Sequence, residues 1–271
     1  MMIRSRTACG ALVLGALILN HQSTIESAIE SAIEPATEST IESAIEPATE
    51  STIESAIRNP QSAMSAWRVL FDGHSLAAFR GYKTATIPAG WHIVKGALAK
   101  DGHAGDLITK DQFGDFELEL EWRIGRAGNS GIFYRGIEDP DFEGRANDDR
   151  IYTTGPEYQL LDDNEAADNK TRLTCAAAAY GLYPSPAGHL KPVGEWNTAR
   201  IVARGPHVEH WLNGFKMVEY ELWSADWEAK VASTKFKAWP KFGRAKVGHI
   251  GLQGDHEGTL AFRNIRIREL K

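Results

Sequence analysis

The chain has 271 residues, 42 % of them hydrophobic, and a formal net charge of −6, which suffices for one folded domain of about 200 residues with appendages. The charge is uneven: residues 1–22 carry +2, residues 23–57 carry eight glutamates and no base, and the remainder carries 28 basic and 28 acidic residues. A formally neutral folded part gives no indication of a basic surface of the kind that binds nucleic acid.

Residues 1–22 resemble an export signal. Arg4 and Arg6 precede an apolar run of about a dozen residues, which is typical of a secretory signal and too short to span a membrane. We therefore expect a periplasmic or extracellular protein, with an uncleaved N-terminus as its only membrane contact. Removal of the signal would leave Cys175 as the single cysteine, so an intrachain disulfide is not expected. We interpret Cys175 as a small buried residue rather than a nucleophile.

Residues 23–63 are predicted to form a disordered linker. Eight tetrads of the type TIES or AIEP fill residues 24–55 and repeat a glutamate at every fourth position. In a helix this spacing would stack like charges without a compensating base, and Pro35 and Pro47 would interrupt it. The segment is therefore expected to be an extended anionic tether.

Residues 64–271 form the predicted folded domain. From Trp67 onward, short segments with alternating apolar and polar residues follow one another, separated by glycine, proline and Asn-Gly signals. They include FELELEWRI (116–124), GIFYRG (131–136), EYQLLD (157–162), NTARIVARG (197–205), GHIGLQ (248–253) and TLAFRNIRIREL (259–270). Hairpin turns are expected at Lys95-Gly96 and Asn213-Gly214.

One short helix is expected over residues 224–236, with Ser224 as the N-cap and acidic residues in the first turn. About ten strands with one helix, and no alternation of strands with helices, predict an antiparallel β-sandwich.

The alternation also predicts a polar groove on one sheet. Because side chains alternate between the two faces of a strand, several polar side chains fall on the face opposite the core and would lie side by side on neighbouring strands. They are Glu121, Arg135, Glu157, Gln159, His249 and Gln253. Carboxylates and amides in such a groove suit a ligand with many hydroxyl groups. His210 alternates with Val208 and Leu212, which favours a core position.

Seven motifs in order resemble the 3-keto-disaccharide hydrolase domain family, over about residues 67–270. They are LFDGHSLAAF (70–79), GDLITKDQFGDFELELEWRI (105–124), GNSGIFYR (128–135), GPEYQLLDD (155–163), KPVGEWNTARIVARG (191–205), VEHWLNG (208–214) and GHIGLQ (248–253). The resemblance implies a concanavalin-like jelly-roll fold and a 3-keto-glycoside or 3-keto-disaccharide substrate.

On such a substrate the resemblance implies elimination followed by hydration. A ketone at C3 acidifies the C2 proton, and a base that removes this proton can expel the aglycone from C1. The reaction needs a general base, a group that stabilises the enolate, and an acid or metal near the leaving group. A conventional glycosidase instead needs two carboxylates; Glu157 and Asp162 would lie on opposite strand faces unless the strand bulges.

Three residues are the catalytic candidates. Glu157 is interpreted as the base or a metal ligand, with a solvent-facing strand residue as the alternative. Arg135 would stabilise the enolate or simply pair with Glu121. His256 lies in a loop after a strand, where catalytic groups collect, and Asp255 could orient it; Gly254 is an insertion relative to the family pattern and leaves both roles open.

The expected substrate-binding residues in these motifs are Glu121, Asn129, Gln159, Asn197, His249 and Gln253. Tyr180 and Tyr183 are added from residues 174–188, a segment in which Gly181 replaces an acidic residue of the family pattern. Asn129 and Ser130 are alternatively residues of a tight turn. No dense ligand motif such as HExxH is present, so a divalent metal ion stays undecided, as does the oligomeric state. The alternatives to a 3-keto-glycoside enzyme are a lectin-like binding module and a conventional glucanase-like glycosidase.

Overall fold

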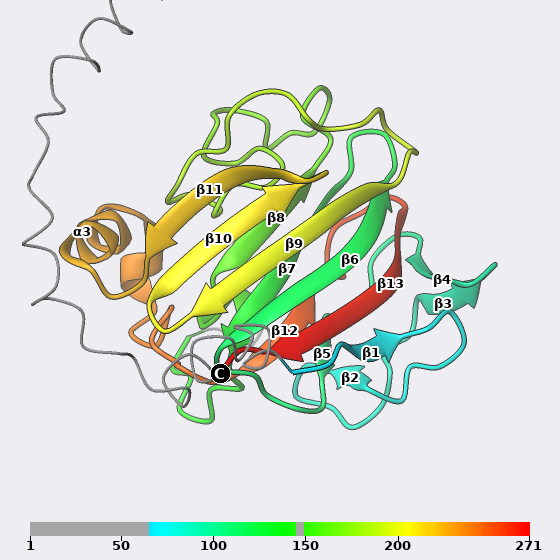
Figure 1. Cartoon of the computed structure of the whole chain (residues 1–271), viewed down its shortest axis with the longest axis horizontal. Coiled ribbons are helices and arrows are strands. Elements are labelled where there is room, and N and C mark those ends of the chain that lie inside the picture. Colours follow the sequence, from blue (N-terminus) through cyan, green and yellow to red (C-terminus); the bar gives the residue numbers. More distant parts are fainter. Residues whose placement is uncertain (1–64, 145–148) are drawn as a thin grey trace, which may run out of the picture. The chain divides into compact units, whose positions relative to one another are not determined.

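A computed structural model describes residues 65–144 and 149–271 and confirms the predicted antiparallel β-sandwich. In Figure 1 the larger sheet lies in front and β7, β8 and β12 of the smaller sheet lie behind it. The expectations for residues 1–22 and 23–63 concern residues outside the described part. Within the two described ranges, no helix is long and apolar enough to cross a membrane.

The larger sheet has eight strands, and the smaller sheet has five. The larger sheet runs in the order β11 (Phe215–Glu221), β10 (His207–Leu212), β9 (Asn197–Arg204), β6 (Phe116–Ile124), β13 (Leu260–Glu269), β4 (Ala97–Lys100) and β3 (Trp91–Val94), and β1 (Arg68–Phe71) pairs with β13. The smaller sheet runs in the order β2 (Phe79–Gly81), β5 (Leu107–Thr109), β12 (His249–Leu252), β7 (Asn129–Gly136) and β8 (Glu157–Leu161).

Both predicted hairpin turns are confirmed. Lys95-Gly96 joins β3 to β4, and Asn213-Gly214 joins β10 to β11. All four residues have positive φ, between 50° and 86°. Two consecutive positive φ values match the twist of the flanking strands, and asparagine and glycine adopt them readily.

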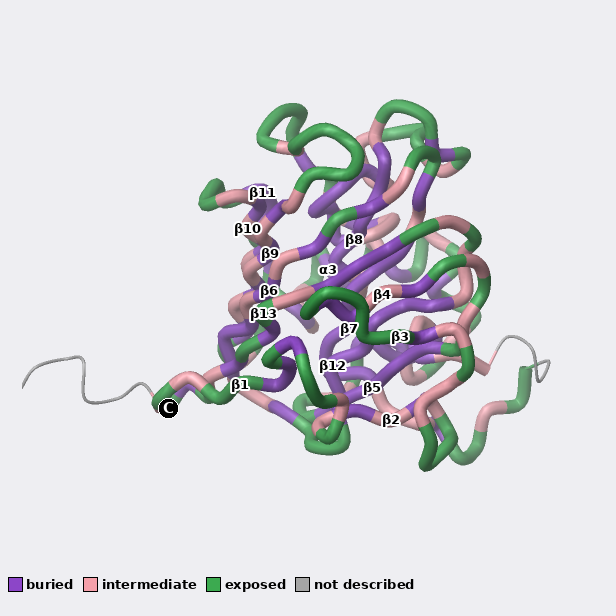
Figure 2. The backbone as a smooth tube through the Cα atoms, turned by 90° about the vertical axis from the view of Figure 1, so that its right-hand side faces the viewer, coloured by how far each residue is buried: buried purple, intermediate pink, exposed green. Residues whose placement is uncertain are grey.

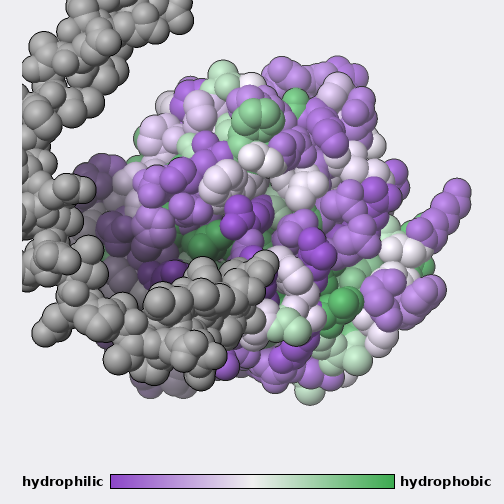
Figure 3. Space-filling view, viewed as in Figure 1, coloured by the Kyte–Doolittle hydropathy of each residue, from purple (hydrophilic) through white to green (hydrophobic). Residues whose placement is uncertain are grey.

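The core lies between the two sheets, where the buried stretches of backbone gather in Figure 2. On β6, Leu118, Leu120 and Trp122 are buried there, as their alternation predicts. The residues on the opposite face of β6 are not all exposed to solvent. Glu117 is buried there, and its carboxylate forms ion pairs with Arg200 and Arg268. The part of this outer face that is visible in Figure 3 is mostly hydrophilic.

His210 is a core residue, as predicted. Its Nδ1 donates to the Ala177 carbonyl (3.0 Å), and its Nε2 accepts from the Tyr134 hydroxyl (2.9 Å). Burial lowers the pKa of His210 to about 4, so the ring is neutral. Cys175 is buried and unpaired with another cysteine, which confirms its interpretation as a small buried residue.

The predicted helix is α3 (Ala225–Ser233), and the Ser224 hydroxyl caps it by accepting from the Trp227 amide at 3.1 Å. It ends earlier than expected because Thr234 is extended. The chain then forms the short 3-10 helix η5 (Lys235–Ala238). A second 3-10 helix, η4 (Ile151–Thr153), precedes β8. The break at Thr234 matters for the site, because it turns the following segment toward β8.

Candidate functional site

A pocket of about 380 Å³ lies on the outer face of the smaller sheet, the size of a small-molecule site. Its floor comes from β7, β8 and the end of β12, and its walls come from loops and from the segment after α3. The lining residues are Asn129, Tyr152, Gly155, Glu157, Gln159, Asp168, Tyr180, Lys235, Phe236, Trp239, Phe242, Gln253, Asp255 and His256.

Glu157 lies at the centre of the floor. It is the first residue of β8, directly after the Gly155-Pro156 turn. Its carboxylate lies over the backbone of Gly131 on the neighbouring strand β7, where a Cβ would overlap it. The absence of a side chain at Gly131 therefore creates the space that the carboxylate occupies.

Burial raises the pKa of Glu157 to about 8. The positive charge of Lys235 opposes this shift, whereas the negative charges of Asp255, Asp168 and Asp106 add to it. A carboxyl group with a pKa near neutral pH can both accept and return a proton under physiological conditions, which is what a general base requires.

Three amide side chains, of Asn129, Gln159 and Gln253, line the pocket together with this carboxyl group. Gln159 Nε2 donates to Asn129 Oδ1 (3.0 Å), and Asn129 Nδ2 donates to Asp168 Oδ2 (3.1 Å). On the other side of Gly131, the Gln253 backbone amide donates to the Gly131 carbonyl (3.0 Å). Asn129 and Ser130 thus begin strand β7 rather than forming a tight turn.

Two buried charged side chains hold the loop that follows β12. Asp106 Oδ1 accepts from the Gly254 amide (2.9 Å), and Lys100 Nζ donates to the His256 carbonyl (2.6 Å). Burial raises the pKa of Asp106 to about 7. The loop carries Asp255 and His256 into the pocket, with 3.9 Å between Asp255 Oδ1 and His256 Nε2. Burial lowers the pKa of His256.

The segment after α3 forms the rim. The Lys235 ammonium lies 4.6 Å from the centroid of the Tyr180 ring, at cation–π distance. Trp239 also contributes to a neighbouring cavity of about 450 Å³. There the Lys241 ammonium is already engaged in ion pairs with Asp139 and Asp141. We therefore regard the Glu157 pocket as the candidate active site.

The structure brings six of the sequence-predicted site residues into this pocket: Asn129, Glu157, Gln159, Tyr180, Gln253 and His256. It does not bring Arg135 there. The backbone φ of Arg135 is +51°, and the pairing of β12 with β7 shifts register beside it. The guanidinium consequently reaches the carbonyls of Gly114 and Gly205 and the Asp115 carboxylate, toward the larger sheet.

Glu121 and Asn197 belong to the larger sheet. Glu121 lies on its outer face and pairs with Arg263, with two contacts of 3.0 Å, and not with Arg135. Asn197 begins β9, and its Oδ1 accepts from the Lys191 amide at 2.9 Å. Both side chains therefore stabilise the larger sheet and its loops.

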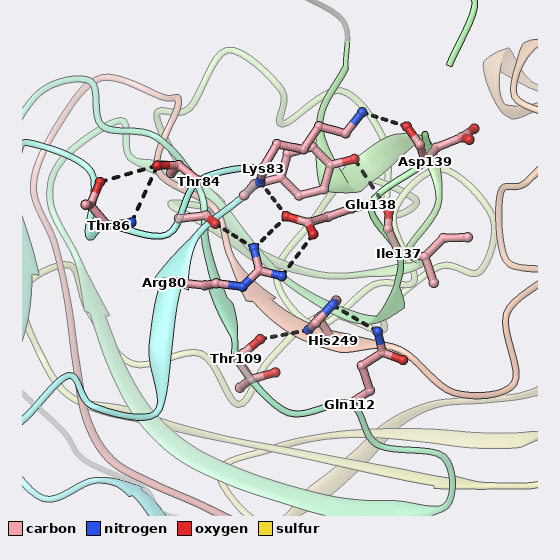
Figure 4. Close-up of polar contacts among 12 residues, drawn as sticks. Arg80, Lys83, Thr84, Thr86, Thr109, Gln112, Ile137, Glu138, Asp139 and His249 are labelled. Carbon is pink, nitrogen blue, oxygen red and sulfur yellow. Dashed lines mark hydrogen bonds and ion pairs between the residues drawn. The ribbon is translucent and has the colours of Figure 1, made fainter. Parts of the chain in front are cut away.

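Tyr183 and His249 also lie outside the pocket. Tyr183 stacks on Tyr220 at 4.6 Å and donates to Asp226 of α3. His249 is buried between β5 and the following loop: Nδ1 donates to the Thr109 carbonyl (2.7 Å) and Nε2 accepts from Gln112 (3.1 Å) (Figure 4). Its imidazole is thus used in joining two segments of the smaller sheet.

Asp168, Lys235 and Trp239 also line the pocket, although the alternation of the strands does not indicate them. Asp168 lies in a loop, Lys235 begins η5 and Trp239 follows it, so all three lie outside the strands. The sequence also offers Asp162 as a second carboxylate near Glu157 if the strand bulges. Asp162 instead accepts from the backbone amides of Ala127 and Asn164 and is not among the pocket residues.

The pocket contains oxygen ligands of the kind that hard cations prefer: the carboxylates of Glu157, Asp168 and Asp255 and the amide oxygens of Gln159 and Gln253. Among the described residues, three side chains that could together hold a metal ion lie close to one another outside the pocket, at His207, Glu209 and Glu219. The Lys216 ammonium lies against both of those glutamates and offsets one of their two negative charges.

Residues 66–268 match the 3-keto-alpha-glucoside-1,2-lyase-like domain family. A protein of Bacteroides thetaiotaomicron named 3-keto-disaccharide hydrolase is 36 % identical over 225 residues, which cover 74 % of this chain and 77 % of that protein.

Solved structures support the fold. A crystal structure from Parabacteroides distasonis, named as a candidate glycosyl hydrolase, is 28 % identical and has a TM-score of 0.68, covering 76 % of this chain and 94 % of that one. A second structure with the same description and source has a TM-score of 0.59 at 28 % identity, covering 76 % of this chain and 100 % of the other.

Proposed function

The chain belongs to the 3-keto-alpha-glucoside-1,2-lyase-like domain family and is a glycoside-cleaving enzyme, and from this premise we propose that its substrates are glycosides with a ketone at C3. The observation that supports this proposal is the carboxyl group of Glu157 on the pocket floor, over Gly131, whose pKa burial raises to about 8. The relative named 3-keto-disaccharide hydrolase supports the same substrate class.

The chemistry follows from the ketone. The Glu157 carboxylate removes the proton from C2, and the electron pair of the C2–H bond moves to form the enolate of the C3 ketone. Collapse of the enolate expels the aglycone oxygen from C1 and leaves a C1–C2 double bond conjugated with the ketone. The aglycone oxygen takes up a proton as it leaves. Water then adds at C1 and releases a proton, and Glu157 returns a proton to C2, so the overall reaction is hydrolysis.

The surroundings of Glu157 suit this cycle. Its raised pKa means that Glu157 holds the proton it has taken. This proton exchanges with the water that enters to hydrate the double bond, and Glu157 then returns a solvent-derived proton to C2. Lys235 is the one lysine or arginine among the residues that line the pocket, and its positive charge acts on Glu157. In this proposal the same charge stabilises the enolate. In this scheme Lys235 takes the electrostatic role that the sequence analysis assigned to Arg135.

The test compares a β-glucoside with its 3-keto counterpart as substrates for the wild-type protein and for Glu157→Gln. We expect aglycone release only from the keto compound and only by the wild-type protein. Release from the unoxidised glucoside at a similar rate would support a conventional glycosidase. Binding without release from either compound would support a lectin-like module.

A further inference from the structure

The candidate site contains an unusual concentration of hydrogen-bond acceptors without donors. Among the residues that the structure describes, six buried side-chain polar atoms lack a hydrogen-bond partner. Two of them are tryptophan nitrogens, and the other four are oxygens of Asp106, Gln159, Gln253 and Asp255. Three of these oxygens belong to residues that line the pocket. Leaving buried acceptors unpaired is unfavourable, so a ligand that supplies donors would bind well here.

The orientation of the Gln159 amide is determined by a chain of contacts that starts at Asp168. Asp168 Oδ2 accepts from Asn129 Nδ2 (3.1 Å) and from the Tyr180 hydroxyl (3.3 Å). A carboxylate can only accept, so it selects the NH₂ end of Asn129. Asn129 Oδ1 must then face Gln159, where it accepts from Nε2 at 3.0 Å. Gln159 Oε1 remains as the buried atom without a donor.

Gln253 lies beside Gly131, on the side opposite Gln159. Its backbone amide donates to the Gly131 carbonyl, and its carbonyl accepts from the Ser130 hydroxyl, both at 3.0 Å. Gly131 pairs directly with Gln159 on its other side. Gln253, Gly131 and Gln159 therefore form a row across three strands, with the Glu157 carboxyl group over the central glycine.

We propose that this row recognises hydroxyl groups of the sugar ring whose C2 proton Glu157 removes, and that Asp168 is the positioning residue that makes it an acceptor surface. The inference rests on the proposed function and deepens it. The Asp168–Asn129–Gln159 relay presents an amide oxygen rather than an amide NH₂ to the ligand. The pocket should consequently discriminate against substrates in which the recognised hydroxyl is missing, because such substrates leave the buried oxygens unpaired.

The experiment measures kcat/KM for a 3-keto-glucoside and its 2-, 4- and 6-deoxy analogues, with wild-type protein and Asp168→Asn. For the wild-type protein we expect a loss of about 100-fold or more for at least one analogue. The asparagine side chain introduced in the variant can donate as well as accept, so the side-chain amides of Asn129 and Gln159 can flip by half a turn. The loss of kcat/KM for the deoxy analogue should then shrink to below about 10-fold. Asp111→Asn, at an exposed ion pair with Arg68, is the matched control and should keep the wild-type ratio.

The ratio between substrates separates this role from a structural one, because a damaged pocket would slow parent and analogue alike. Equal rates for all analogues with the wild-type protein, or an unchanged ratio in Asp168→Asn, would overturn the inference. Absence of turnover with the parent 3-keto compound would instead overturn the proposed function. In that case, dissociation constants of the unoxidised glucoside and its deoxy analogues decide the inference by the same ratios.

Discussion

Replacing Glu157 with glutamine should abolish turnover and at the same time stabilise the folded protein at high pH. In the folded protein the carboxyl group keeps its proton up to a pKa of about 8, whereas the unfolded chain loses it near the ordinary value of 4.5. Between these values the folded state binds more protons, so the free energy of unfolding of the wild-type protein falls as the pH rises.

The size of the effect follows from the two pKa values. Each unit of pH between 4.5 and about 8 is equivalent to about 1.36 kcal/mol, which gives about 5 kcal/mol as an upper limit. Because the Glu157 side chain keeps some access to water, we expect the glutamine variant to be more stable by roughly 2 to 4 kcal/mol at pH 9. The two proteins should be equally stable near pH 4, where both side chains are neutral.

Urea unfolding at pH 4, 7 and 9 measures the stability difference, and aglycone release from a 3-keto-glucoside measures turnover. Loss of the base should lower kcat by about 10² to 10⁴, and wild-type kcat/KM should rise with pH toward a plateau above about 8. Glu119→Gln, at the ion pair with Arg266 on the larger sheet, is the matched control and should change neither quantity appreciably. Retained turnover in Glu157→Gln, or a stability difference independent of pH, would refute the reasoning.

Three further outcomes are expected. Gly131→Ala should abolish turnover while the protein still unfolds cooperatively on heating, because the added methyl group occupies the position of the Glu157 carboxylate; wild-type rates would show that this position is not needed. Arg135→Met should lower the free energy of unfolding by about 3 kcal/mol by leaving two backbone carbonyls unpaired, yet the folded fraction should keep its kcat; a selective loss of kcat with unchanged stability would restore Arg135 as the enolate-stabilising group. Residues 64–271 alone should cleave the 3-keto-glucoside with the kcat/KM of the full chain, within about twofold; a large loss would contradict the inert-tether interpretation of residues 23–63.

Local signals were enough to predict the sandwich. The alternation of β6 and the Asn213-Gly214 turn reflect constraints that act over a few residues, namely side-chain direction along a strand and positive φ in a tight turn. The short strands β1, β2 and β5 escaped prediction, because three or four residues carry too little alternation to be distinguished from a loop.

The sequence predicted the site residues whose side chains follow the regular alternation of a strand. That alternation does not place a residue whose backbone departs from it or that lies outside a strand. Glu157 and Gln159 share a face of β8 and meet in the pocket, as their spacing indicated. Arg135 does not follow the parity of its strand, because positive φ and a register shift turn its side chain toward the larger sheet. Asp168 and Lys235 come from segments whose path depends on tertiary packing, so no sequence period could locate them.

The claim that Glu157 removes the C2 proton is tested most directly by cleaving a 3-keto-glucoside in deuterated water and locating deuterium in the sugar product. Incubating the 3-keto sugar itself with the enzyme corrects for exchange after cleavage. Elimination and hydration predict deuterium at C2 at a rate that matches aglycone release, and no release with Glu157→Gln. Aglycone release with hydrogen retained at C2 would contradict the account, because the glycosidic bond would then break without deprotonation of that carbon.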